Sequence, residues 1–161
     1  TPGISLGSEL IAVMGEPLHY EGELCLLTQG GRVAGVGFGL DLTKRETQST
    51  LKAAGLPWER SKAFTGSALF SEFVTAPEDL SQLGLELHVD DTLRQKGDVS
   101  LMLYPPHVIL NELRQFLVIE DFDIIMTGTP AGVGAVQPGE RFHGRVLEGD
   151  QTLVSGAWLA G

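Results

Sequence analysis

The sequence predicts a mainly β domain with short helices, an α+β fold. Glycine and proline are frequent, with 21 and 8 among 161 residues, which implies many turns. Hydrophobic residues make up 42% of the chain, and the length fits one domain able to bury a full core. Together these observations favour a loop-rich β domain over a helical bundle.

Strands are expected first, followed by one capped helix. Residues 9–14 alternate weakly, and residues 19–28 and 33–40 form two β-prone segments around a turn at 29–31. We expect a helix over residues 44–54. Thr43 and Glu46 have the spacing of an N-terminal capping box, and Gly55 stands at the C-cap.

The rest of the chain alternates strands with turns around one further helix. Residues 83–89 and 92–96 flank Asp90-Asp91 as a hairpin would. A second, amphipathic helix should begin at the Pro105-Pro106 pair and carry its apolar positions as far as 116–117. The last expected strands cover residues 123–127, 141–147 and 152–158.

Charge and cysteine content exclude several classes of partner. The net charge is −10, and the 11 basic residues form no cluster, which argues against nucleic acid and anionic membranes. A small anionic substrate remains compatible, because a local cation can outweigh the global field. The single cysteine, Cys25, allows no internal disulfide and fits a small buried side chain in a cytoplasmic protein. No apolar stretch of membrane-spanning length is present.

Three carboxylates suggest a metal site. Glu21 and Glu23 are two positions apart on an expected strand, so they share one face about 6.7 Å apart. Oxygen ligands of this kind suit Mg²⁺, Mn²⁺ or Ca²⁺. Asp41, expected to end the following strand, could be a third ligand. The alternatives are a solvent-exposed Glu pair and a helix-capping Asp.

A glycine-rich turn is the second candidate. TGTPAGVG at 127–134 follows an apolar segment and lacks the Lys-Ser/Thr ending of a phosphate-binding loop. Its backbone N–H groups could hold a substrate carboxylate, or the turn could be purely structural. His19 shares the face of Glu21 and is either a site residue or a hydrogen-bonded rim residue.

Four blocks in order resemble one family. HYEGEL at 19–24, DLTKRETQ at 41–48, GLPWERSKAF at 55–64 and TGTPAGVG at 127–134 are similar to the fumarylacetoacetate hydrolase family. The likeness is strongest to its branch of acylpyruvate hydrolases, oxaloacetate decarboxylases and hydroxyheptadienedioate isomerases. It implies a mixed β-roll or barrel-like sandwich, paired into homodimers. Residues 1–161 would be a single catalytic domain lacking an upstream N-terminal segment.

The resemblance also implies roles for individual residues. Glu21, Glu23 and Asp41 would bind Mg²⁺ or Mn²⁺. Lys62 and Thr129 would be catalytic and bind substrate together with the backbone of Gly128.

The implied activity is that of a metal-dependent isomerase, decarboxylase or C–C hydrolase. It would act on a small 2-oxo or 2-hydroxy-dienoic acid through a metal-stabilised enolate. In similar family members, the general base for hydrolysis is a His/Glu pair on an upstream segment. The alternative is a noncatalytic metal- or 2-oxo-acid-binding protein, or a structural subunit of the same fold.

Overall fold

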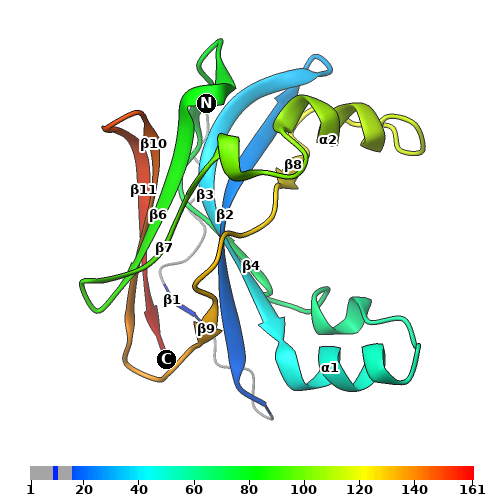
Figure 1. Cartoon of the computed structure of the whole chain (residues 1–161), viewed down its shortest axis with the longest axis vertical. Coiled ribbons are helices and arrows are strands. Elements are labelled where there is room, and N and C mark those ends of the chain that lie inside the picture. Colours follow the sequence, from blue (N-terminus) through cyan, green and yellow to red (C-terminus); the bar gives the residue numbers. More distant parts are fainter. Residues whose placement is uncertain (1–8, 11–15) are drawn as a thin grey trace.

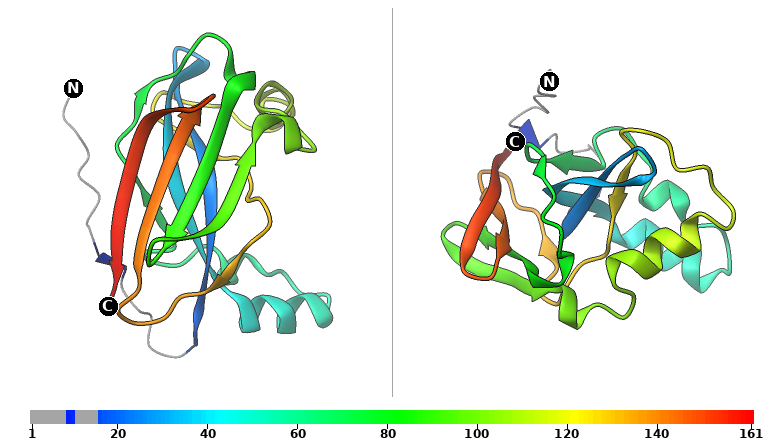
Figure 2. Two further views of the ribbon diagram at one scale, coloured as in Figure 1. Left: turned by 60° about the vertical axis from the view of Figure 1, so that its left-hand side comes forward. Right: turned by 90° about the horizontal axis from the view of Figure 1, so that it is seen from above.

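Two β-sheets face each other in the computed structural model, which describes residues 9–10 and 16–161 (Figures 1 and 2). The five-stranded sheet has the order β1 (Glu9–Leu10), β11 (Gln151–Ala160), β10 (Arg141–Glu148), β6 (Leu83–Val89) and β7 (Thr92–Asp98). All its pairs are antiparallel except β1 with β11. Residues 11–14 of the expected first strand lie outside the described residues.

The six-stranded sheet is built on one long hairpin. Its order is β4 (Ala68–Phe70), β3 (Arg32–Lys44), β2 (Leu18–Gln29) and β8 (Ile124–Met126), with β5 (Val74–Thr75) paired to β3 and β9 (Gly134–Ala135) paired to β2. All of these pairs are antiparallel. The expected mainly β fold is confirmed as a two-sheet sandwich, and its described strands do not close into a barrel.

The core lies between the sheets because alternate residues of each strand point inward. Phe38 from β3 is fully buried and packs near Trp158 of β11. Gly144 of β10 makes room for this ring, since a Cβ there would lie 2.2 Å from Phe38. Burying each such large side chain contributes roughly 1.5–3 kcal/mol.

Two tight turns fix the register of the hairpins. Gly30 and Gly31 join β2 to β3, and both have positive φ, as a type I′ turn requires. Asp90 and Asp91 join β6 to β7 with φ of 48° and 62°. The predicted hairpin at residues 83–96 is therefore confirmed, with aspartates in place of the more usual Asn-Gly.

The first helix, α1 (Arg45–Ala53), has a different cap from the one the sequence suggests. Strand β3 continues through Lys44, so Thr43 is held buried in the strand and cannot fold back over the helix. Its hydroxyl has no hydrogen bond among the described residues, and the predicted capping box is wrong. The Glu16 carboxylate instead accepts from the backbone N–H of Thr47 at 3.2 Å. The predicted glycine at the C-terminal end is confirmed, because Gly55 follows the C-cap residue Ala54 with φ of 64°.

The second helix, α2 (Pro106–Leu113), begins on proline as predicted but ends earlier than expected. Phe116 and Leu117 lie beyond its end, 73% and 52% exposed, so the amphipathic pattern overestimated its length. Short 3₁₀ turns cover η1 (Glu59–Ser61), η2 (Leu80–Gln82) and η3 (Val99–Leu101). No helix in the described part of the chain has the length and apolar character needed to span a membrane.

Candidate metal centre

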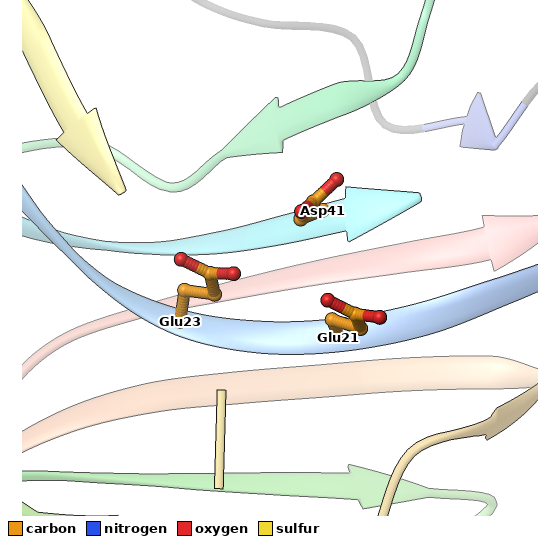
Figure 3. A group of neighbouring side chains, drawn as sticks. All are labelled: Glu21, Glu23 and Asp41. Atoms are coloured by element: carbon orange, nitrogen blue, oxygen red, sulfur yellow. The ribbon is translucent and has the colours of Figure 1, made fainter. Parts of the chain in front are cut away.

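The β2–β3 hairpin brings the three acidic side chains together (Figure 3). Glu21 lies directly opposite Asp41 in the ladder, and Glu23 follows two residues later on the same face of β2. One carboxylate oxygen from each lies within 4.8 Å of the others. Asp41 does not end its strand, as the sequence suggested. It lies within β3, three residues before Lys44, and its position is set by ladder pairing rather than by helix capping.

Lys62 lies between two of these carboxylates. It follows η1, and its Nζ lies 2.9 Å from Glu21 Oε2 and 2.6 Å from Asp41 Oδ2. Burial alone would lower the pKa of the lysine, but hydrogen bonds to the two anions outweigh this and raise it. Lys62 is therefore an ammonium at neutral pH, suited to holding negative charge rather than to acting as a base.

Arg45 is a second cation at the centre, one to which sequence analysis gave no role. Its guanidinium pairs with Glu21 and also donates to the buried Gln48 side chain at 2.8 Å. Burial would raise the pKa of Glu21, but the bonds to Lys62 and Arg45 hold it below its ordinary value. A signal was present in the sequence, because a basic residue in the first helical turn opposes the helix dipole and suggests another function.

Glu23 is the least compensated of the three carboxylates. Glu23 is 4% exposed, and among the described residues the only hydrogen bond to its carboxylate comes from the Gly128 N–H at 2.7 Å. Burial, followed by the repulsion of Asp41 and Glu21, raises the pKa of Glu23 to about 7 despite that bond. A buried carboxylate is costly without a cation. A hard divalent cation held by oxygen ligands would remove this cost, so the donor set fits Mg²⁺ or Mn²⁺.

The glycine-rich turn closes one side of the centre. Gly128, with φ of 96°, places its N–H on Glu23. The Thr129 hydroxyl donates to the Gly22 carbonyl at 2.9 Å, and Thr127 donates to the Leu24 carbonyl through both its N–H and its hydroxyl. The turn is thus fastened to β2 beside the two glutamates.

Two other sequence candidates lie close by. Cys25 is fully buried, and burial raises the pKa of its thiol well above the ordinary value, which keeps it protonated and unreactive. His19 is half-buried at the edge of the centre, where burial and then the charge of Arg45 lower the pKa of its imidazole.

An apolar pocket of about 330 Å³ lies beside the centre rather than over it. Gly128 and Thr129 line it, but none of the three carboxylates does. Leu24 also lines it, and strand alternation places Leu24 on the opposite face of β2 from Glu23. The turn at 127–130 therefore separates two environments, one anionic and one apolar.

The sequence profile of the fumarylacetoacetate hydrolase C-terminal domain matches residues 4–156. The chain belongs to the fumarylacetoacetate hydrolase family. This result confirms the resemblance suggested by the four sequence blocks.

Family relatives share about a third of its residues. The mitochondrial oxaloacetate tautomerase FMP41 of Saccharomyces cerevisiae is 35% identical over 87% of this chain and 62% of its own length. The rice mitochondrial oxaloacetate tautomerase FAHD2 is 39% identical over 78% of this chain and 62% of its own length. This chain therefore spans less than two thirds of the length of these relatives.

A solved family structure shows the same fold. Fumarylpyruvate hydrolase from Pseudomonas aeruginosa, in complex with Mn²⁺ and pyruvate, has a TM-score of 0.85 and 30% identity. The match covers 94% of this chain and 70% of that one. A yeast fumarylacetoacetate hydrolase family protein matches with a TM-score of 0.86 and 32% identity, covering 94% of this chain and 70% of its own.

Proposed function

We propose that this chain is the catalytic domain of a divalent-metal-dependent enzyme acting on a small 2-oxo acid. The observation that carries the proposal is the convergence of three carboxylates within 4.8 Å, with Glu23 buried and paired to no cation in the described part of the chain. Two same-face glutamates and an opposing aspartate form a site that makes physical sense once a cation shares their oxygens.

Glu21, Glu23 and Asp41 would hold Mg²⁺ or Mn²⁺ in this proposal. When bound, the cation would act as a Lewis acid on the keto oxygen of a 2-oxo acid and stabilise the negative charge of its enolate. The fumarylpyruvate hydrolase with Mn²⁺ and pyruvate supports both the metal and the substrate class. Three protein oxygens leave coordination positions for the two oxygens of such an acid.

The chain's own cations would bind and orient the substrate. Lys62 and Arg45 contribute two positive charges at the edge of the carboxylate cluster, both still partly exposed at 23% and 30%. Either side chain can therefore meet an anionic ligand without being drawn out of a closed core. Gly128 and Thr129 would border the same ligand from the opposite side, with their turn fixed to β2.

Keto–enol tautomerisation of oxaloacetate is the reaction we assign first, because several relatives are named oxaloacetate tautomerases. It requires only proton transfer between carbon and oxygen of an already bound 2-oxo acid. C–C hydrolysis of an acylpyruvate is the second candidate, favoured by the fold shared with fumarylpyruvate hydrolase. Decarboxylation would use the same charge stabilisation.

Calorimetric titration with Mn²⁺ and Mg²⁺, joined to an oxaloacetate tautomerase assay, tests the proposal. The wild-type chain should bind metal and accelerate tautomerisation only with metal present. Asp41→Asn should lose both properties. Glu86→Gln is the control, because the Glu86 side chain, 9% exposed against 20% for Asp41, pairs with Arg145 and Lys96 on the five-stranded sheet.

Two results would contradict this function. Equal metal affinity in wild type and Asp41→Asn would refute the proposal that Asp41 helps to hold the metal. Metal binding without turnover of oxaloacetate or an acylpyruvate would instead favour the noncatalytic binding or structural role.

We also propose that two copies of the chain pair through the segment that carries η3 and the start of α2. Leu101, Leu103 and Tyr104 there are 70%, 92% and 65% exposed. Residues 99–110 contain no charged side chain, whereas the whole chain carries a net charge of −10. Like-charged copies can therefore approach through this uncharged segment at low electrostatic cost. Leu103→Lys should convert a dimer to a monomer in light scattering, and a wild-type monomer would refute the pairing.

A further inference from the structure

Strand β2 has a gap in its hydrogen-bond ladder at the candidate metal centre. On the side away from β3, β9 pairs with residues 19–20 and β8 pairs with residues 25–27. Residues 21–24, which include both glutamates, lie between these two pairings. Backbone groups in such a gap need other partners when they are buried.

The side chain of Gln95, from β7 of the opposite sheet, fills part of this gap. Its Oε1 accepts from the Gly22 N–H at 2.8 Å. Its Nε2 donates to the Thr129 hydroxyl at 2.8 Å and to the Pro130 carbonyl at 2.9 Å. Gln95 is 1% exposed, so its bond to Gly22 is buried and those to Thr129 and Pro130 are partly buried. One amide thus joins the glutamate-bearing strand to the glycine-rich turn.

We propose that Gln95 is a positioning residue that holds the turn at 127–130 in its ligand-binding place. The inference rests on the proposed function, in which this turn borders the bound 2-oxo acid. Gln95 does not touch the carboxylates itself. It acts through Thr129 and Pro130, which directly follow Gly128, whose N–H is bonded to Glu23.

Only an amide in this orientation satisfies every partner. Gly22 offers a donor, whereas Pro130 offers an acceptor, so the side chain needs an oxygen at one point and an N–H at the other. The hydroxyl of Thr129 already gives its proton to the Gly22 carbonyl and therefore also needs a donor from Gln95. A glutamate would keep the bond from Gly22 but place an anion against the carbonyl of Pro130.

The glycines around Gln95 show that the contact is close. A Cβ on Gly22 would lie 3.1 Å from Gln95 Oε1, so the glycine between the two glutamates leaves room for the amide. A Cβ on Gly97 of β7 would lie 2.9 Å from Pro130 Cβ. A Cβ on Gly132 would lie 2.0 Å from the carbonyl oxygen of Arg94. The glycine-rich segment 127–134 therefore packs closely against β7 on both sides of Gln95, through the Pro130 ring at Gly97 and through Gly132 at the Arg94 backbone.

The Thr129 hydroxyl takes a structural role in this arrangement. It donates to Gly22 and accepts from Gln95, which commits its only proton inside the protein. A ligand carboxylate needs donors, so it would meet the backbone N–H of Thr129 rather than this hydroxyl. The N–H groups of Thr127 and Gly128 are already donated to β2. Holding that backbone still is what Gln95 contributes, because pre-organised donors lose less entropy on binding.

The test compares Gln95→Glu and Gln95→Leu with wild type and with Thr28→Val. Thr28 is also on β2, is fully buried, and donates to the carbonyls of Glu120 and Asp123, far along the strand from the glutamates. Thermal unfolding checks that each variant folds. Calorimetry then measures the affinity for Mn²⁺ and for oxalate added to the Mn²⁺-loaded protein. NMR follows amide exchange at Thr127 and Gly128 without metal.

Gln95→Glu should bind oxalate roughly tenfold more weakly, while its Mn²⁺ affinity changes by less than about threefold. Exchange at Gly128 should accelerate roughly tenfold in both Gln95 variants. Thr28→Val should leave all three measurements near the wild-type values, even where its thermal stability falls. A general loss of stability would lower both affinities together, so the split between oxalate and Mn²⁺ reports the positioning role.

Unchanged oxalate affinity in Gln95→Glu would overturn the proposal, as would unchanged exchange at Gly128. Failure of the proposed function has a different signature, because the wild-type chain would then bind neither Mn²⁺ nor oxalate. In that case exchange at Gly128 still decides the anchoring role. Unchanged exchange refutes it, and acceleration supports it.

Discussion

Glu21 on β2 lies directly opposite Asp41 on β3, and both carboxylates contact the same lysine ammonium. Like charges at directly opposed positions of a ladder destabilise it. Here the pair is tolerated because Lys62 joins the two anions and Arg45 adds a second cation at Glu21. Once Glu23 is ionised, three carboxylates face two cations, and the resulting net charge of −1 still attracts a divalent cation.

Lys62→Met should separate metal binding from catalysis. In the proposed centre the ammonium and a divalent cation would share oxygens of Glu21 and Asp41, so removing the ammonium should raise Mn²⁺ affinity a few-fold. Tautomerase turnover should fall, because the substrate loses a positive charge. Unfolding of the chelator-treated protein should become easier by about 1–3 kcal/mol, since two partly buried carboxylates lose a partner.

Calorimetry, steady-state kinetics and urea denaturation measure these three effects. Lys96→Met is the control, because Lys96 is 66% exposed and pairs with Glu86 rather than with any of the three carboxylates of the centre. It should change stability by less than about 1 kcal/mol. Weaker Mn²⁺ binding in Lys62→Met would contradict the idea of shared oxygens.

Glu23→Gln should abolish metal binding without weakening the fold. The amide oxygen can still accept from the Gly128 N–H, and a buried charge is removed, so the free energy of unfolding should stay the same or rise. Mn²⁺ affinity should fall by at least about a hundredfold, because losing even an outer-shell partner costs 10- to 100-fold. Glu86→Gln should show the reverse, with weaker stability and normal affinity. A destabilised Glu23→Gln that still binds Mn²⁺ would refute both statements.

The stability of the chelator-treated protein should carry the pH signature of Glu23. Its pKa is raised from 4.5 to about 7, so the folded state holds this proton more tightly than the unfolded state. The protonated Glu23 therefore stabilises the folded state fully below about pH 4.5, and this contribution is lost as pH rises through about 7. Two and a half pKa units correspond to about 3 kcal/mol.

Comparison of wild type with Glu23→Gln isolates this contribution from the other titrating groups. Wild type should lose up to about 3 kcal/mol relative to the variant between about pH 5 and about pH 8 in urea denaturation with chelator. Added Mn²⁺ should reverse the trend for wild type alone, since a metal ligand must be deprotonated. A difference that stays constant with pH would show that Glu23 titrates normally.

Local sequence patterns predicted much of the fold. Residues 83–89 alternate cleanly and form β6 over the same range. The Gly30-Gly31 pair correctly predicted the turn between β2 and β3, and the proline pair correctly predicted the start of α2. The pattern failed where tertiary contacts decided the outcome. Strand β3 extends through Lys44 because β2 pairs with it to that point, which removed Thr43 from its expected capping role.

The site was only partly visible in the sequence. The Glu-x-Glu spacing is enough to place Glu21 and Glu23 on one face, because strand alternation is a local property. Pairing of Asp41 with Glu21 depends on the hairpin register, and the position of Lys62 followed only from the family resemblance. Gln95 left no local signal. A glutamine on an edge strand looks like a solvated residue until the turn at 127–130 covers it.

Gly132→Ala should disrupt the contact between the glycine-rich segment 127–134 and β7. Gly132 has φ of 105°, and a Cβ there would lie 2.0 Å from the carbonyl oxygen of Arg94. Backbone strain and overpacking together should cost about 2–5 kcal/mol of unfolding free energy. Gly139→Ala is the matched control, with φ of 86° and no atom within 4 Å of its Cβ. It should lose only the conformational part, about 1–2 kcal/mol. Urea denaturation of both variants measures the difference, and equal losses would mean that the turn moves freely away from β7.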